Sequence, residues 1–77
     1  MKAAHLKAYK QLQAIGAPVY LWEDVGRFVI SAEENSKENL WAHCDMEYMN
    51  PSIVSILKAN KLDYEWYDGG TAMVHQA

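Results

Sequence analysis

Residues 62–75 read LDYEWYDGGTAMVH, and this stretch decides the fold. Two runs of strand-forming residues flank Asp68-Gly69-Gly70, a sequence typical of a tight hairpin turn. The stretch therefore predicts two antiparallel strands, Leu62–Tyr67 and Thr71–His75. With Gly69-Gly70 as the turn, the predicted cross-strand pairs are Trp66 with Met73 and Tyr64 with His75.

A second hairpin is predicted between Val19 and Ile30. The runs VYLW (19–22) and RFVI (27–30) are rich in β-branched and aromatic residues. Between them, EDVG suits a type I turn followed by Gly26 at positive φ. The second strand should continue to about Ala32. The predicted cross-strand pairs are Glu23 with Arg27 and Trp22 with Phe28.

Two helices are predicted on either side of this hairpin. Residues 1–15 show helical periodicity, and Gly16 and Pro18 then end the helix. Asn50 and Pro51 suit the N-cap and the first position of a short second helix that ends near residues 60–61. The apolar sides consist of Met1, Ala4, Ala8, Leu12 and Ile15, bordered by His5 and Tyr9, and of Ile53, Ile56 and Leu57.

The segment Leu40–Met49 fits two structures. Its apolar and polar residues alternate, which favours a strand, but it lacks β-branched residues and is rich in helix formers. Ser36 is suited to cap such a helix, so we expect a helix here and keep the strand as the alternative. Together the elements predict one α+β domain over residues 1–77. Its small antiparallel sheet is built from two hairpins and packs against an N-terminal helix and a short central helix.

The composition predicts a cytoplasmic protein. Cys44 is the only cysteine, so no disulfide can form within the chain, and a lone thiol favours a reducing compartment. Lysines interrupt the N-terminal stretch, so it forms no signal peptide, and no apolar run is long enough to span a membrane.

The charge distribution argues against a nucleic-acid partner. Residues 1–10 hold three lysines and no acid, whereas the rest of the chain holds ten Asp and Glu against four Lys and Arg. A body this acidic repels nucleic acid at long range. An alternative is that the basic N-terminus contacts nucleic acid locally, although its lysines also suit the exposed side of a helix.

One segment contains residues that could bind a metal: His43, Asp45 and Glu47. Imidazole and carboxylate are common zinc and iron ligands, but a site needs three or four ligands in a recognisable spacing, which the sequence lacks. Cys44 has acidic neighbours that disfavour a thiolate, so it is expected to be a small core residue. We predict no cofactor and no metal, and keep this metal site as the alternative.

No catalytic motif is present. The glycines at 69–70 lie at a hairpin tip rather than at the start of a helix, so they do not form a phosphate loop. The mixture of rings and acids near the C-terminal hairpin instead suits contact with a basic protein, because Trp and Tyr are favoured interface anchors. The simpler interpretation, which the pattern favours, is that half of these rings face the core and the others shield the second face of the sheet. The candidate protein-binding residues are Tyr64, Glu65, Trp66 and Asp68.

The C-terminal half also resembles a group of known proteins. Leu40-Trp41-Ala42 followed by Tyr48, and Asn50-Pro51 followed by Leu62-Asp63-Tyr64-Glu65-Trp66-Tyr67, are similar to short uncharacterised proteins of bacterial phages and mobile elements. The His43-Cys44-Asp45 stretch departs from the aromatic pair expected there. The resemblance implies a phage accessory protein and no activity, cofactor or site.

The sequence thus predicts a non-enzymatic binding or regulatory protein that acts on a protein partner through an acidic, aromatic surface. A homodimer is expected, because a small core and exposed hairpin edges favour pairing across a two-fold axis. The alternative function is a small metal-binding protein that uses His43 with Asp45 or Glu47.

Overall fold

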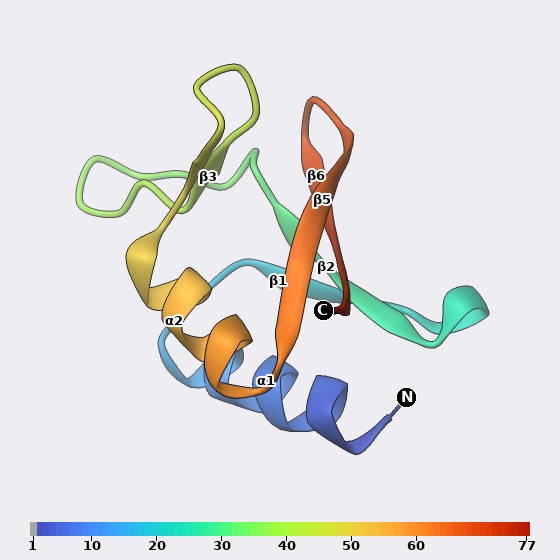
Figure 1. The fold of residues 1–77 in the computed structure, drawn as a ribbon. Helices are drawn as coiled ribbons and strands as arrows, with labels where there is room; N and C mark the ends of the chain where they lie inside the picture. The colour runs from blue at the N-terminus through green and yellow to red at the C-terminus, as the bar shows by residue number, and fades with distance from the viewer. Residues whose placement is uncertain (1) are drawn as a thin grey trace.

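The computed structural model describes residues 2–77, apart from the side chain of Val25, as two helices and two antiparallel sheets (Figure 1). This confirms the predicted α+β class, with an N-terminal helix packed on a sheet of two hairpins. The elements are α1 (Ala3–Ala14), β1 (Val19–Trp22), the 3₁₀ turn η1 (Glu23–Val25), β2 (Arg27–Ser31), β3 (Ala42–His43), β4 (Tyr48–Met49), α2 (Pro51–Ala59), β5 (Leu62–Asp68) and β6 (Thr71–Gln76).

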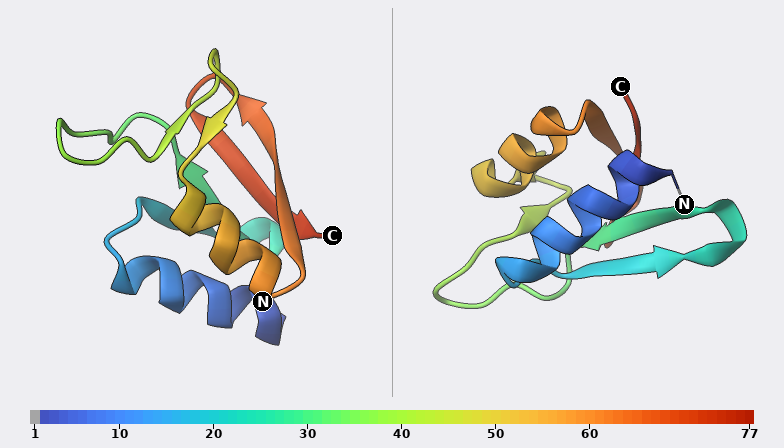
Figure 2. Two further views of the ribbon diagram at one scale, coloured as in Figure 1. Left: turned by 60° about the vertical axis from the view of Figure 1, so that its left-hand side comes forward. Right: turned by 90° about the horizontal axis from the view of Figure 1, so that it is seen from below.

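The main sheet has the strand order β1-β2-β6-β5, and all of its neighbouring strands are antiparallel. The two hairpins therefore join through β2 and β6, which leaves β1 and β5 as the edges. Both helices lie on the same face of this sheet (Figure 2), with α1 against β1 and β2 and α2 against β5.

The hydrophobic core fills the space between the helices and the sheet. Its largest fully buried side chains come from every layer, and Phe28 stands at its centre with an edge-to-face contact to His5 (ring centroids 6.2 Å apart). The six largest are Phe28, Leu12, Ile30, Ile53, Leu57 and Val74.

The buried side of α1 differs from the predicted one. Ala8 and Leu12 are buried as expected, but Ala4 and Ile15 are exposed, and His5 is buried in their place. The buried side of α1 is therefore rotated toward His5 and Tyr9, which border the predicted apolar side. The Tyr9 ring packs against Phe28. The predicted contribution of Met1 lies outside the described residues.

The second helix begins as predicted. The Asn50 side chain accepts a hydrogen bond from the Ser52 backbone N–H (2.9 Å), and Pro51 takes the first helical position, where the missing N–H has no cost. Asn60 ends the helix and donates from Nδ2 to Gln11 Oε1 (2.9 Å), which ties α2 to α1.

Both predicted hairpin registers are wrong by one residue. In the first hairpin Trp22 pairs with Arg27 and Leu21 with Phe28, because all four residues of EDVG belong to the turn. Gly26 has the expected positive φ of 63°. In the second hairpin Asp68 pairs with Thr71 across the two glycines as a tight turn requires. A bulge at Tyr67 then pairs Trp66 with Ala72 and Tyr64 with Val74.

The segment 40–49 is not a helix but the β3–β4 hairpin, in which Ala42 pairs with Met49 and His43 with Tyr48. The side chain of Asn35 explains the difference. Its Oδ1 accepts from the backbone N–H groups of Trp41 (2.8 Å) and Ala42 (3.3 Å), and its Nδ2 donates to the carbonyls of Ala32 (3.2 Å) and Ala42 (3.0 Å). These bonds hold the backbone in an extended path that a helix would not allow.

Candidate functional site

The main sheet has one face that neither helix covers. Side chains alternate between the two faces of a strand, and cross-strand partners share a face. Phe28, Ile30, Ala72 and Val74 point to the helices, so their sequence neighbours point away. We call this surface the open face. It consists of Tyr20, Trp22, Arg27, Val29, Ser31, Asp63, Glu65, Tyr67, Thr71, Met73 and His75.

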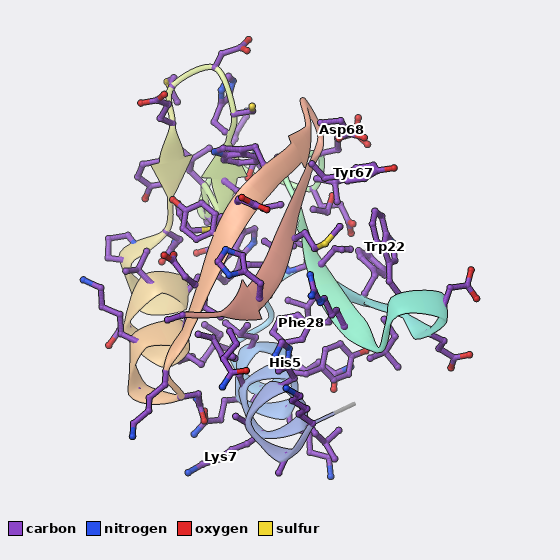
Figure 3. The ribbon with its side chains drawn as sticks, turned by 45° about the vertical axis from the view of Figure 1, so that its right-hand side comes forward. His5, Lys7, Trp22, Phe28, Tyr67 and Asp68 are labelled. Atoms are coloured by element: carbon purple, nitrogen blue, oxygen red, sulfur yellow. The ribbon has the colours of Figure 1, made fainter. Side chains whose placement is uncertain are left out.

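Two aromatic rings meet on the open face. Trp22 from β1 and Tyr67 from β5 come from the two edge strands, yet their ring centroids lie 4.9 Å apart with an interplanar angle of 89°. Figure 3 shows the pair beside the sheet with Asp68 next to it, whereas His5 and Phe28 lie over α1. Tyr67 keeps 61% of its surface exposed, more than any other large hydrophobic residue in the described chain.

A small apolar cluster lies on the same face of the sheet as these rings. Val29 is only 4% exposed although it lies outside the core cluster between helices and sheet. Its cross-strand partners on the open face are Tyr20 and Met73, and Arg27 Nη1 lies 3.6 Å from Met73 Sδ. Val29, Tyr20 and Met73 therefore lie side by side on the open face, where Val29 is buried.

Acidic residues surround the open face. The Tyr20 hydroxyl donates a hydrogen bond to the Glu34 carboxylate, and this bond raises the pKa of Tyr20. The side chain of Glu33 lies against Gly70, and Asp68 Oδ1 accepts from the Gly70 N–H (2.9 Å). The acids in the strands of the open face, or in segments attached directly to their ends, are Glu23, Asp24, Glu33, Glu34, Asp63, Glu65 and Asp68.

The helices carry the opposite charge. Neither α1 nor α2 contains an acidic residue, so all ten Asp and Glu lie in strands, turns and loops. We call α1, α2 and their flanking residues Lys2 and Lys61 the helical layer. It holds five of the seven Lys and Arg: Lys2, Lys7, Lys10, Lys58 and Lys61.

The four predicted protein-binding residues do not share one surface. Tyr64 and Trp66 are half-buried on the helix side, where they pack against the core and each other (ring centroids 6.1 Å apart). Burial, followed by the charges of Asp63 and Glu47, raises the pKa of Tyr64. Glu65 is exposed on the open face, and Asp68 is exposed at the turn.

The candidate metal ligands lie in and after β3. His43 is half-buried in the strand, and Asp45 and Glu47 are exposed in the turn that follows. Within residues 2–77 no three His, Cys, Asp or Glu side chains gather in a way that could hold a metal ion. Cys44 is also in this turn and half-buried, so it is not the core residue that the sequence predicts.

Comparison of the chain with protein-family models, curated proteins and solved structures found no match. The resemblance to phage proteins therefore stays a prediction. A search of the described residues also found no helix with the length and apolar character that crossing a membrane requires.

The sequence interpretation missed Trp22 and Tyr67 as a pair. Alternation within β5 places Asp63, Glu65 and Tyr67 on one face and Tyr64 and Trp66 on the other, so the side of Tyr67 could have been predicted. Its contact with Trp22 could not, because it depends on the twist of the sheet and on the bulge after Trp66.

Proposed function

We propose that the chain is a non-enzymatic binding protein that holds a basic, extended segment of a protein partner on the open face. The observation that carries this proposal is the Trp22–Tyr67 pair, with Tyr67 exposed and Trp22 half-buried. The pair lies on a sheet face that neither helix covers and that acidic side chains surround.

The ring pair supplies the apolar part of such a contact. Trp and Tyr are enriched among the residues that dominate binding energy at protein interfaces. An edge-to-face pair leaves ring surface on which a Lys or Arg side chain can stack, and a cation over an indole face contributes about 0.5–2 kcal/mol. Because Val29 and its neighbours already support the strands, little ordering is required when a partner binds.

The acids supply the specificity for a basic partner. The open face and its flanking segments hold seven of the ten acids and only two of the seven Lys and Arg, namely Lys61 and Arg27. A surface of one sign steers partners of the opposite sign and rejects those of the same sign. The helical layer is basic and would instead favour an acidic partner. The helical layer and the open face should therefore not compete for the same partner.

A defined cationic peptide tests the proposal. We expect hepta-arginine to bind saturably in calorimetric titrations at low salt, with an affinity that falls as salt rises. Trp22→Ala and Tyr67→Ala should each raise the Kd about thirtyfold, which corresponds to about 2 kcal/mol for an interface anchor.

A matched pair of charge reversals separates the open face from general electrostatics. Glu65→Lys lies on the open face, whereas Glu38→Lys lies in the exposed loop between β2 and β3 and changes the net charge equally. Only the first should weaken binding several-fold. Equal losses in the two variants, or unchanged binding in Trp22→Ala, would mean that the open face is not the binding site.

We also propose that the chain forms a homodimer through an edge of the main sheet. The strand order leaves β1 and β5 without a partner on one side, and β5 is the longer edge with seven residues. Sedimentation equilibrium over a concentration series should show reversible dimer formation. A single monomeric species at the highest concentrations would rule the dimer out.

A further inference from the structure

A small cavity lies where α1 begins, away from the Trp22–Tyr67 pair. Its volume is about 200 Å³. Three distant parts of the chain meet there: the start of α1, the turn of the first hairpin and the end of the last strand. The lining residues are Lys2, His5, Gly26, Arg27 and Gln76.

The cavity is basic although the chain is acidic. Two of its five lining residues are permanent cations, and none is an acid. Burial lowers the pKa of His5, and the nearby charges of Arg27 and Lys2 lower it further. A site where cations repel one another favours an anion that neutralises them.

The cavity is also lined by the buried imidazole of His5, a feature that does not depend on the charges. The side chain is only 5% exposed, lines the cavity and stacks edge-on against Phe28. Its Nδ1 is buried without a hydrogen-bond partner. A buried polar atom without a partner costs about 1–3 kcal/mol, and such groups in folded proteins call for a functional explanation.

The first turn of α1 adds backbone donors. The helix is twelve residues long, no side chain caps its N-terminus, and its first turn contains no acid. The first N–H groups of a helix lack partners within the helix, and they carry the positive end of the helix dipole. An anion at this position would satisfy donors that nothing else in the described chain caps.

We infer that this cavity, which we call the oxyanion pocket, binds a small dianion of the phosphate class. Helix N–H groups recognise tetrahedral oxyanions through several donors at once. Lys2 can add a charge-assisted bond, because its Nζ donates to Gln76 Oε1 over a long 3.4 Å. Arg27 belongs both to the pocket and to the open face, where it pairs with Trp22. Neither ring of the Trp22–Tyr67 pair lines the pocket, so the inference does not rest on the proposed function.

A titration with inorganic phosphate tests the inference. In ¹H–¹⁵N spectra recorded at constant ionic strength with chloride as the balancing salt, the amides of Ala3, Ala4, His5 and Gly26 should shift saturably. Acetate carries a single charge and should bind at least about tenfold more weakly. Shifts that rise linearly without saturation, or equal binding of acetate and phosphate, would overturn the inference.

Two charge reversals on the same helix provide the matched comparison. Lys2→Glu removes the pocket's ammonium, and Lys10→Glu makes the same change two turns further along α1. We expect Lys2→Glu to raise the Kd for phosphate about tenfold, as loss of a charge-assisted bond implies, and Lys10→Glu to change it less than about twofold. Equal effects would show a general response to net charge and contradict a defined pocket.

His5→Phe tests the buried imidazole while keeping a ring against Phe28. It should also weaken phosphate binding several-fold. Because Lys2 is exposed, Lys2→Glu remains decisive even if the His5 variant does not fold. A folded His5→Phe protein with wild-type phosphate affinity would exclude the imidazole from the pocket.

Discussion

The helical layer and the open face of the sheet carry opposite charges and use their aromatic rings differently. The helices contain lysines and no acid, and the rings that face them are buried, as Phe28 is, or half-buried, as Tyr64 and Trp66 are. The open face is bordered by acids and exposes Tyr67 and part of Trp22. A four-stranded sheet with helices on one side only therefore separates a buried core from an exposed face of rings and acids within a very small chain.

The difference also shows how a small domain limits the cost of an exposed face. The four-stranded sheet could have been covered by a further helix, which would add core. Instead Val29, Met73 and the ring pair form a thin apolar cluster on the open face. Substitutions in each region should show whether the core on the helix side and the open face act independently.

The largest loss of stability should come from truncating a core side chain on the helix side of the sheet. Phe28→Ala removes a fully buried ring that contacts His5 and Tyr9, and should lower the free energy of unfolding by about 3–5 kcal/mol. Val29→Ala, the adjacent residue on the open face, should cost only about 1–2 kcal/mol. Urea unfolding followed by circular dichroism measures both. Equal losses would mean that the open face holds a second full core.

The next effect concerns Asn35, whose four hydrogen bonds hold the start of β3 against the segment that follows β2. Asn35→Ala should lower the free energy of unfolding by about 2 kcal/mol, because it leaves part-buried backbone groups without partners. Hepta-arginine binding should not change. Asn39→Ala, in the same loop, is the control for stability. A loss of peptide binding in Asn35→Ala would show that the two regions are coupled.

A smaller effect should appear in the pH dependence of stability. The unfolded chain takes up a proton on His5 near pH 6.5, but burial and the charges of Arg27 and Lys2 lower the pKa in the folded protein. The unfolded state therefore binds more protons below pH 6.5, and stability falls as the pH falls through this range. Denaturant midpoints of wild type and His5→Phe should diverge there. Parallel curves would contradict a buried neutral His5.

The smallest effect should be local to the edge of the open face. Glu34→Gln removes the carboxylate that accepts from the Tyr20 hydroxyl, so the pKa of Tyr20 should fall toward its ordinary value of 10.0. The Tyr20 ring carbon resonances report this titration. Glu33→Gln, one residue earlier, should leave it unchanged. The same shift in both variants would indicate a general effect of charge rather than this hydrogen bond.

Much of the fold follows from local signals in the sequence. Gly26 and Gly69-Gly70 mark the two turns, and Asn50-Pro51 marks the start of α2, because each residue suits one backbone position and few others. The structure confirms the two hairpins and the helix that these signals predict, and their order along the chain. They do not set the register, since that depends on a four-residue turn in one hairpin and on the bulge at Tyr67 in the other.

The remaining features depend on contacts between distant residues. Local composition favours a helix at 40–49, but Asn35 bonds the backbone of this segment from outside it. The sequence placed the candidate protein-binding residues in the C-terminal hairpin alone, whereas the ring pair of the open face joins Tyr67 of that hairpin to Trp22 of the first one. A pattern within one segment does not show which segments meet in the fold. The acids near the open face could therefore be predicted, whereas the Trp22–Tyr67 pair could not.

The most direct test of the separation between the two regions is one residue-resolved map of two titrations. With hepta-arginine, amide and indole shifts should concentrate on Trp22, Tyr67 and their neighbours in β1, β2, β5 and β6. Inorganic phosphate should instead shift the first turn of α1. If hepta-arginine mainly shifts the loop and turn at residues 36–47, or if both probes shift the same residues, the open face is not a distinct recognition surface.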